Sequence, residues 1–207
     1  DGAAVYLEAF THVTGAAPHA LITNPHGQTE GQILTALLEL NGHPATMLDD
    51  VLTELDRRTH ALHESGYVRT PVAGGPDALL AATRHGWANA LLTGNGQQHS
   101  RVKLTAAGYA EEDFDWTNSF FGDRSPDRHH LTALVATVLG DQPRVIVGDT
   151  PNDGVAADSA GIPFIAVATG AYTVADLRDT SALVVVDDLV SGLDDVLGAI
   201  EELDKRG

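Results

Sequence analysis

Two aspartates that stand four residues apart, just after an apolar stretch, are the residues best suited to chemistry. Residues 145–147 (Val-Ile-Val) are β-branched, which favours a parallel strand buried on both faces. Gly148 lets the backbone turn, and Asp149 then stands at the carboxyl end of the strand, where open α/β sheets bind ligands. Asp153 follows at the start of the next helix. Paired carboxylates suit Mg²⁺, so the sequence predicts a magnesium site; the alternative is an acidic helix cap without a metal.

A second turn from a strand to a helix carries a hydroxyl group and two glycines. Residues 90–92 are apolar, Thr93 ends the strand, and Gly94-Asn95-Gly96 opens the next helix. A hydroxyl beside the backbone N–H groups of a helix N-terminus forms a cradle for an anion. The alternative is that Thr93 is an ordinary cap. The glycines also begin like a dinucleotide-binding fingerprint, but no third glycine follows at the required place.

Lysine occurs only twice in the chain, which draws attention to Lys103. Lys103 lies on the helix that begins after the Thr93 turn, whereas Lys205 lies in the C-terminal tail. A compact ammonium group on that helix can reach a phosphate group and the acidic turn. Arg124 and Arg128 compete with it for this role, and the alternative for Lys103 is a solvated surface position.

The elements that must position these residues divide the chain into a helical part and an α/β part. Apolar residues at helical spacing predict helices over residues 1–15, 29–40 and 44–64. Residues 68–76 are rich in Pro and Gly, which marks a domain boundary. We therefore expect a small all-helical cap at residues 1–70 and an α/β core at residues 71–207.

Strands and helices alternate in the expected core. Strands are predicted over residues 87–92, 114–121, 144–147, 164–168 and 182–186, and helices over residues 77–85, 97–107, 126–139, 151–160, 174–178 and 189–203. This alternation predicts an α/β fold with a Rossmann-like parallel sheet and flanking helices. A helical module joined to such a core by a hinge is typical of a lid. In it, the polar loop His26-Gly27-Gln28-Thr29 is expected to face the site, with a simple connection between helices as the alternative.

The composition excludes several classes of partner. The chain has 207 residues, a formal net charge of -17 and no cysteine. A strongly acidic chain lacks the basic face that binds nucleic acid or an anionic membrane. The absence of cysteine fits a reducing cytoplasm, where we expect the protein. The ten histidines are scattered without a metal-binding spacing, so zinc is not expected.

These motifs resemble those of the haloacid dehalogenase (HAD) superfamily, in its phosphoglycolate-phosphatase-like branch with a helical cap. Residues 91–95 match the second family motif, a strand that ends in Thr or Ser. Lys103 matches the third motif, a basic residue. Residues 148–153 match the fourth motif, G-D-x-x-N-D, and the apolar tail that follows it continues through Val167. The resemblance covers nearly the whole chain.

The first family motif, an apolar strand with D-x-D-x-T, has no match at the expected place. Residues 113–117 fit the pattern literally, but they follow two glutamates instead of an apolar strand and come after the second motif. The family places its first strand beside the strand of residues 145–147. We therefore expect an N-terminal segment of roughly fifteen to twenty residues before Asp1, which is what a strand, its motif loop and a linker need.

The resemblance implies a Mg²⁺-dependent phosphomonoester hydrolase that acts on a small phosphorylated metabolite through a phosphoaspartate. It implies that Asp149 and Asp153 bind the metal, that Thr93, Gly94 and Asn95 hold phosphate oxygens, and that Lys103 offsets the charge. His26 and Gln28 are the expected cap contacts to substrate. The alternatives are a non-catalytic or truncated relative and a phosphosugar mutase on the same scaffold. No nucleic-acid or membrane partner is expected, and the protein is expected to be a monomer or homodimer.

Overall fold

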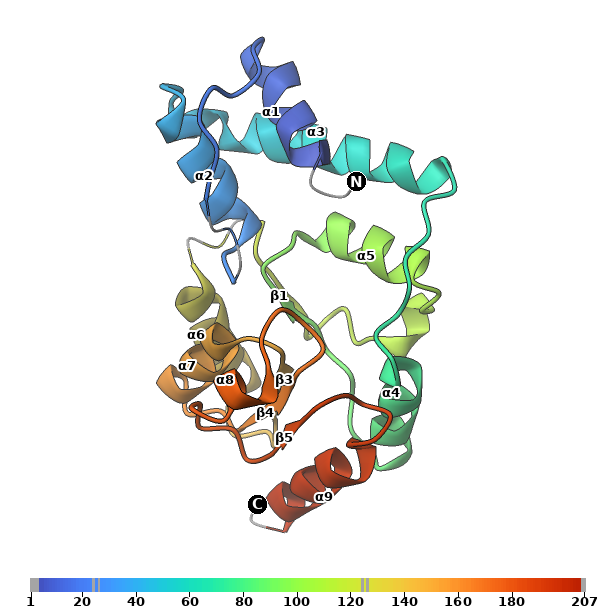
Figure 1. Cartoon of the computed structure of the whole chain (residues 1–207). Helices are drawn as coiled ribbons and strands as arrows, with labels where there is room; N and C mark the ends of the chain where they lie inside the picture. The colour runs from blue at the N-terminus through green and yellow to red at the C-terminus, as the bar shows by residue number, and fades with distance from the viewer. Residues whose placement is uncertain (1–3, 24, 26, 124, 126, 206–207) are drawn as a thin grey trace. The chain divides into compact units, whose positions relative to one another are not determined.

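A computed structural model describes residues 4–23, 25, 27–123, 125 and 127–205 of the chain (Figure 1). The residues form two compact units. Unit 1 contains residues 1–70, 93–108 and 121–127, and unit 2 contains residues 71–92, 109–120 and 128–207. The helices are α1 (Ala4–Thr14), α2 (Glu30–Leu40), α3 (Leu48–Glu64), α4 (Gly75–Arg84), α5 (Gln97–Ala106), α6 (Arg128–Leu139), α7 (Pro151–Ser159), α8 (Val174–Leu177) and α9 (Leu193–Asp204), with 3-10 turns η1 (Ala45–Met47) and η2 (Glu111–Asp113). The strands are β1 (Leu92–Thr93), β2 (Phe120–Phe121), β3 (Ile146–Gly148), β4 (Phe164–Val167) and β5 (Val185–Val186).

Unit 1 is built on the three helices that the apolar spacing predicted near the N-terminus. The third begins as the 3-10 turn η1 and continues as α3 to Glu64, and Gly66, with φ of +82°, follows its end. The helices bury a common apolar core of Val5, Ala9, Phe10, Leu34, Leu37, Leu38, Val51, Leu52 and Leu55. Helix α5 packs against α3 in the same unit. Burial of the common core is the main favourable term that holds α1, α2 and α3 together.

The start of α2 is fixed to two turns of unit 1 that lie far away in the sequence. Thr29 caps the helix as predicted, since its hydroxyl oxygen accepts a hydrogen bond from the Gln32 amide at 3.1 Å. The same hydroxyl donates to the Ser125 carbonyl at 2.6 Å. The Gly31 amide donates to the Gly122 carbonyl at 2.9 Å. Helix α2 therefore begins in close contact with the turn that follows β2.

Gly31 shows how closely the α2 terminus approaches this turn. A Cβ atom on Gly31 would lie 2.7 Å from the carbonyl oxygen of Asp123, which is backbone and cannot easily move. We expect Gly31→Ala to lower the free energy of unfolding by about 1–3 kcal/mol, the usual cost of overpacking. Gly198→Ala is the matched control in α9, where a Cβ meets nothing within 4 Å, and should raise it by about 0.5–1 kcal/mol. Chemical denaturation of the two variants measures both changes, and stabilisation by Gly31→Ala would contradict the close approach.

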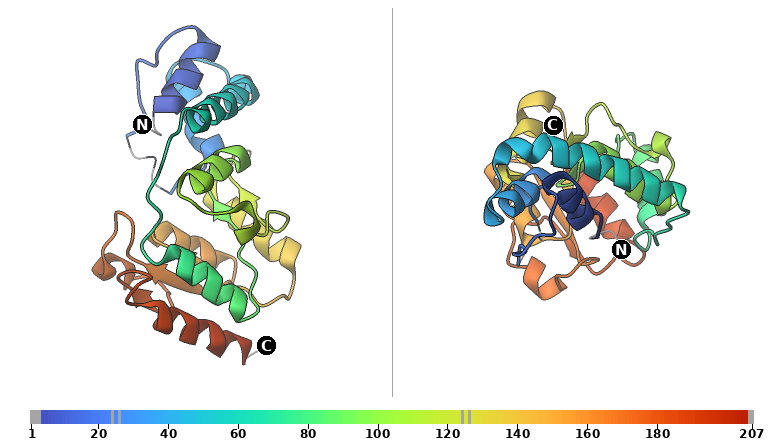
Figure 2. Two further views of the ribbon diagram at one scale, coloured as in Figure 1. Left: turned by 90° about the vertical axis from the view of Figure 1, so that its right-hand side faces the viewer. Right: turned by 90° about the horizontal axis from the view of Figure 1, so that it is seen from above.

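Unit 2 contains a parallel three-stranded sheet in the order β3-β4-β5, with helices on both faces (Figures 1 and 2). Its central strand β4 is buried at every residue. Phe164 and Ala166 pack on one face with residues of α6, α7 and α8, and Ile165 and Val167 pack on the other with residues of α9. Helix α4 lies beside α9. The predicted fold class, an α/β fold with parallel strands and flanking helices, is confirmed.

The prediction that residues 145–147 form a strand buried on both faces is wrong for one face. Ile146 is buried and packs with the core of α6 and α7, but the side chain of Val147 is 48% exposed. Val147 of β3 pairs in register with Ile165 of β4. Helix α9 covers Ile165 on this face of the sheet but does not cover Val147. The strand that is buried on both faces is β4, because it alone has a paired strand on each side in this sheet.

Strands β1 and β2 are much shorter than the predicted strands over residues 87–92 and 114–121. They pair in a separate two-stranded sheet. The Leu91 amide donates to the Ser119 hydroxyl at 2.9 Å, and Asp115 accepts bonds from the amides of Thr117 and Asn118 at 3.1 Å. Backbone bonds from the Asp115 amide to the Asn89 carbonyl and from the Phe120 amide to the Leu91 carbonyl, both at 2.7 Å, also join the segments. The side-chain bonds interrupt this backbone pairing, so a regular ladder does not form before Phe120.

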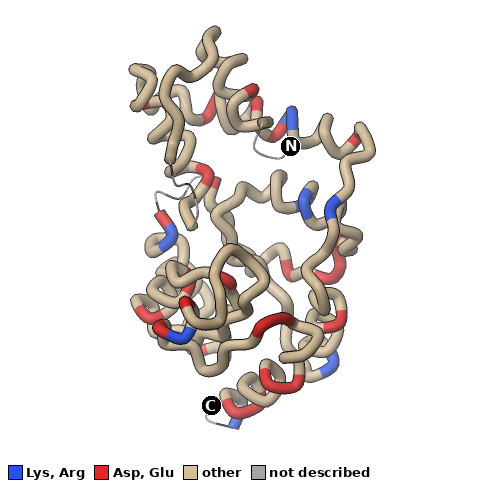
Figure 3. Tube along the Cα trace, in the orientation of Figure 1, with Lys and Arg blue, Asp and Glu red and all other residues tan. Residues whose placement is uncertain are grey.

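Acidic residues are distributed along both units, and Lys and Arg are few (Figure 3). Among the described residues, no helix is long and apolar enough to cross a bilayer. The predicted division into a helical cap and an α/β core stays a prediction. The packing units begin to divide at the same place, between residues 70 and 71, but residues 93–108 and 121–127 pack with the helices of unit 1.

Candidate active site

The turn between β3 and α7 carries the two predicted metal-binding aspartates, and both lie in unit 2. Thr150 and Asp153 form a reciprocal capping box at the start of α7. The Thr150 hydroxyl oxygen accepts from the Asp153 amide at 3.1 Å, and Asp153 Oδ2 accepts from the Thr150 amide at 3.2 Å and its hydroxyl at 2.8 Å. This local motif, Thr-x-x-Asp before a helix, was present in the sequence and was missed. It fixes the Asp153 carboxylate at the strand end.

Arg128, at the start of α6, is the cation that contacts this turn within unit 2. Its Nη2 donates to Asp153 Oδ1, and the two side chains are 18% and 7% exposed. The buried Nε of Arg128 has no hydrogen-bond partner within the described part of the chain. The sequence left Lys103, Arg124 and Arg128 as competing cations. The structure pairs Arg128 with the acidic turn, whereas Arg124 lies outside the described residues.

Asp149 is half-buried and has no comparable counter-charge. Burial raises the pKa of its carboxyl, and the nearby Asp153 charge raises it further, while Arg128 only partly opposes these effects. Its Oδ2 lies against Gly170, where a Cβ atom would come within 2.0 Å of that oxygen. The glycine therefore leaves room for the carboxylate.

The donor set at this turn fits a small divalent cation. Among the described residues, no cluster of three or more metal-binding side chains is found, and the turn offers two carboxylates. Mg²⁺ commonly keeps several water ligands and needs only one or two carboxylates from the protein. A bound cation would offset the burial and the Asp153 charge, which both disfavour the ionised form of Asp149. Both oxygens of Asp153 already accept bonds from Arg128 or Thr150, so this residue can join the ion only by sharing an oxygen or by releasing a partner.

The turn after β1 lies in unit 1 and brings three of the predicted phosphate-binding residues together. The Thr93 hydroxyl oxygen accepts from the Asn95 amide at 3.2 Å and from Asn95 Nδ2 at 2.9 Å. Lys103 Nζ donates to Asn95 Oδ1 at 2.7 Å, because long helical side chains point back toward the N-terminus. Both acceptor positions of the Thr93 hydroxyl are thus filled, and its proton remains to donate to a ligand.

Two further predicted contacts concern the loop before α2. The Gln28 backbone lies against Gly94, where a Cβ atom would meet the Gln28 carbonyl oxygen at 2.5 Å. The structure therefore brings this loop to the Thr93 turn, inside unit 1. His26, the other predicted substrate contact, lies outside the described residues. The predicted site residues thus gather in two groups: Gln28, Thr93, Gly94, Asn95 and Lys103 in unit 1, and Asp149 and Asp153 in unit 2.

Two residues of unit 1 that the sequence reasoning missed, Glu30 and His99, are buried beside the Thr93 turn. Glu30 Oε2 accepts from the Gly96 amide at 2.6 Å, and Glu30 Oε1 bonds with His99 Nδ1. The two residues are 69 positions apart. No local spacing could have paired them, although a glutamate directly after a predicted N-cap was visible.

Residues 113–117, which fit the D-x-D-x-T pattern literally, have local structural roles. Asp113 Oδ2 accepts from the Ala110 amide at 2.9 Å at the start of η2. Asp115 accepts from Asn118 Nδ2 at 2.7 Å and from two backbone amides, which lower the pKa of its carboxyl. Both carboxylates stabilise turns.

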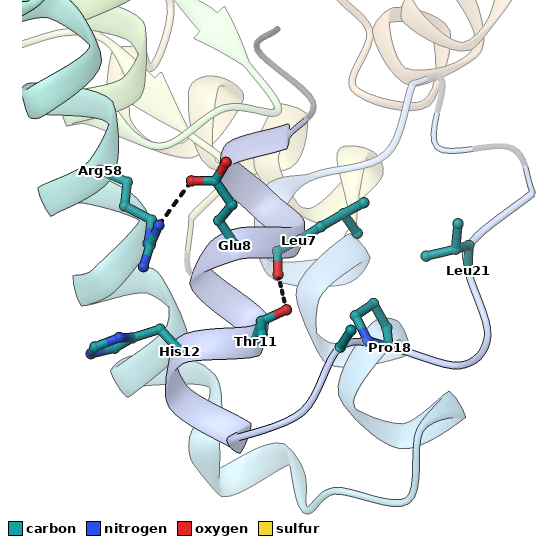
Figure 4. A pocket seen from close by; sticks show the side chains of 8 residues that line it. Leu7, Glu8, Thr11, His12, Pro18, Leu21 and Arg58 are labelled. Atoms are coloured by element: carbon teal, nitrogen blue, oxygen red, sulfur yellow. Dashed lines mark hydrogen bonds and ion pairs between the residues drawn. The ribbon is translucent and has the colours of Figure 1, made fainter.

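A cavity of about 530 Å³ opens in unit 1 between α1, the loop after it and Arg58 of α3 (Figure 4). Leu7, Pro18 and Leu21 contribute its apolar lining. Arg58 and Glu8 also line it and form an ion pair at 2.8 Å. None of the predicted site residues lines this cavity.

Residues 124–192 match the family model described as HAD-hydrolase-like. The match includes the acidic turn, Arg128 and Gly170. This segment, about a third of the chain, is similar to the HAD superfamily of hydrolases. Hydrolases of this superfamily generally use a divalent metal ion, in agreement with the donor set of the turn. The assignment to its phosphoglycolate-phosphatase-like branch stays a prediction.

Three solved structures share the fold of this chain along nearly their whole length. A hydrolase from Pseudomonas syringae has a TM-score of 0.64 and 16% identity, with 95% of this chain and 94% of that chain covered. A HAD hydrolase of family IA, variant 3, from Entamoeba histolytica has a TM-score of 0.63 and 15% identity, covering 97% and 92%. A protein assigned as a β-phosphoglucomutase from Thermotoga maritima has a TM-score of 0.53 and 22% identity, covering 95% and 94%. No curated protein matches the sequence.

Proposed function

We propose that the protein is a Mg²⁺-dependent phosphomonoester hydrolase that acts on a small phosphorylated metabolite. The observation that carries the proposal is Asp149, a half-buried carboxylate at the carboxyl end of β3 whose charge is poorly compensated. Such a carboxylate binds a divalent cation readily. The match of residues 124–192 to a HAD-hydrolase-like family supports the same reaction class.

The turn of Thr93 supplies the proposed phosphate contacts. The free proton of the Thr93 hydroxyl donates to one phosphate oxygen, and the Gly94 amide donates to another. Asn95 orients that hydroxyl and links it to the Lys103 ammonium, whose charge offsets that of the phosphate. The Gln28 backbone adjoins this turn, which supports Gln28 as a proposed contact to the rest of the substrate.

The acidic turn supplies the proposed metal site. Asp149 binds the ion directly, and Asp153 binds it or orients one of its water ligands while Arg128 holds the other carboxylate oxygen. When bound, Mg²⁺ neutralises negative charge on the phosphoryl group.

The nucleophile of the proposed reaction is the aspartate expected before residue 1. Its carboxylate oxygen bonds to phosphorus, the ester bond breaks, and the leaving alcohol takes a proton from a second acid. Water then hydrolyses the phosphoaspartate. This step is proposed from the family resemblance.

Phosphosugar mutase activity is the second candidate, because the Thermotoga maritima protein is named for such a reaction. ³¹P NMR of sugar monophosphates, incubated with the protein carrying its upstream residues and Mg²⁺, separates the two. A rising signal of inorganic phosphate supports the hydrolase. A second sugar-phosphate signal without free phosphate supports the mutase. No change across a broad panel of phosphomonoesters would contradict both.

Gly170→Ala tests the placement of Asp149 without removing the carboxylate. The new Cβ overlaps Asp149 Oδ2, so the carboxylate must turn away from its position. We expect affinity for Mn²⁺, measured by electron paramagnetic resonance as a probe for Mg²⁺, to fall about 10- to 100-fold, as when a ligand loses its support. Gly198→Ala, whose Cβ meets nothing within 4 Å and whose backbone is helical, is the control for an added methyl group in unit 2. Unchanged affinity in Gly170→Ala would place the ion elsewhere.

A further inference from the structure

A buried charged cluster in unit 1 joins three helices at the Thr93 turn. Glu30 of α2 and His99 of α5 are 2% and 3% exposed. Tyr6 of α1 donates its hydroxyl proton to Glu30 Oε1 at 2.6 Å, and its oxygen lies 3.2 Å from His99 Nδ1. Burying the Glu30–His99 pair costs free energy of desolvation, and several hydrogen bonds to the pair must offset that cost. The phosphatase proposal makes no use of this cluster.

Both the backbone amide and the side-chain carboxylate of Glu30 form hydrogen bonds to the Thr93–Gly96 turn. Its amide donates to the Gly94 carbonyl at 2.6 Å, and its Oε2 accepts from the Gly96 amide at 2.6 Å. Gly96 directly precedes α5, so the carboxylate lies at the positive end of that helix. The sequence had predicted that a ligand anion would bind there. The protein's own carboxylate occupies this place.

Glu30 also provides negative charge for Lys103. Burial lowers the pKa of the Lys103 ammonium, and the Arg69 charge lowers it further, whereas the Glu30 charge opposes both effects. The pKa of the Glu30 carboxyl is lowered. Burial alone would raise it, but the hydrogen bond and charge of His99, together with the hydrogen bonds from Tyr6 and Gly96, have the larger effect. Glu30 is therefore ionised at neutral pH and helps to keep Lys103 charged.

We propose that Glu30 is a positioning residue for phosphate binding, which holds the Thr93–Gly96 turn in shape and keeps the Lys103 ammonium charged beside Asn95. A phosphate group then binds on the Thr93 and Lys103 side of the turn, since Glu30 fills the N-terminus of α5. The inference rests on the proposed function for its ligand. The effect of Glu30 on the pKa of Lys103 can be measured without any catalysed reaction.

The first test follows the titration of Lys103 by NMR. Labelling with [ε-¹³C]lysine gives only two side-chain signals, and Lys103→Arg identifies the one from Lys103, with Lys205 as an internal reference. Glu30→Gln should lower the pKa of Lys103 because it removes the opposing negative charge. Tyr6→Phe keeps that charge, and Glu39→Gln makes the same change at an exposed position of α2, so both should leave the pKa unchanged. An unchanged pKa in folded Glu30→Gln would overturn the proposal.

The second test measures inorganic phosphate binding by calorimetry on the same variants. We expect Glu30→Gln to weaken binding about 10-fold, in the range found when supporting residues are removed, and Glu30→Asp to recover part of the loss because it keeps the charge. Glu39→Gln should bind as the parent does. If Glu30→Gln unfolds, Glu30→Asp with His99→Gln provides the comparison, and parent-like binding in both would overturn the proposal.

The two tests separate this inference from the proposed function. A shifted Lys103 pKa and weakened phosphate binding, in a protein that hydrolyses no phosphomonoester, would support the positioning role and contradict the phosphatase. Hydrolysis that is unaffected by Glu30→Gln would do the reverse.

Discussion

Asp149→Asn is expected to abolish Mg²⁺-dependent hydrolysis by a form of the protein that carries the proposed upstream aspartate. The loss in kcat/KM should exceed the roughly 100-fold found when only a supporting partner of a metal ligand is removed, because here a ligand itself is lost. Affinity for Mn²⁺ should fall with it. The assay is hydrolysis of p-nitrophenyl phosphate over a range of Mg²⁺ concentrations, with exposed Asp158→Asn of α7 as the control.

The same substitution should stabilise the metal-free chain. Burial and the Asp153 charge raise the pKa of the Asp149 carboxyl, so the ionised form is disfavoured in the folded state and the neutral amide removes that cost at neutral pH. Thermal unfolding in EDTA measures the change. A variant that keeps activity, or that is less stable than the parent in EDTA, contradicts the role of Asp149 as an under-compensated metal ligand.

Arg128→Gln is expected to have the largest effect on stability. It leaves the 7%-exposed Asp153 without its cationic partner and beside a second carboxylate. Breaking a buried pair costs about 3 kcal/mol or more, which corresponds to a fall in Tm of about 6–12 °C for a chain of this length. We expect a fall in Tm near the lower end of this range, because the Arg128 side chain remains 18% exposed and solvent weakens the pairing. Calorimetry measures the shift.

Two variants serve as controls for the Arg128 prediction. Arg178→Gln removes the same charge from an exposed position of unit 2 and should change Tm little. Arg128→Gln combined with Asp153→Asn should recover part of the lost stability, because the unpaired charge is then gone. Equal losses in the single and double variants would show that the contact contributes packing and no electrostatic pairing.

The helices of unit 1 and the two strand-end turns could be predicted because their signals are local. Thr29 capped α2 as expected from a side-chain oxygen just before an apolar helical pattern. Helix α5 ends within one residue of its predicted end. The acidic turn after β3 followed from residues within nine positions of one another.

The predictions that failed depended on contacts between distant residues. An apolar run such as residues 145–147 does not reveal which strand will be covered on both faces, and α9 covers β4 but not Val147. The strands around residues 87–92 and 114–121 were shortened by side-chain bonds from Ser119 and Asp115 to the backbone. The Glu30–His99 pair joins residues that only the folded chain brings together.

The proposed Mg²⁺-dependent phosphatase activity is tested by hydrolysis of p-nitrophenyl phosphate, in Mg²⁺ and in EDTA, by the protein extended with the proposed upstream residues. Residues 1–207 alone, Asp113→Asn and Asp149→Asn complete the comparison. We predict hydrolysis only in Mg²⁺, only with the upstream residues, unaffected by Asp113→Asn and lost in Asp149→Asn. Hydrolysis by residues 1–207 that disappears in Asp113→Asn would contradict the upstream nucleophile, and equal rates in Mg²⁺ and EDTA would contradict the metal dependence.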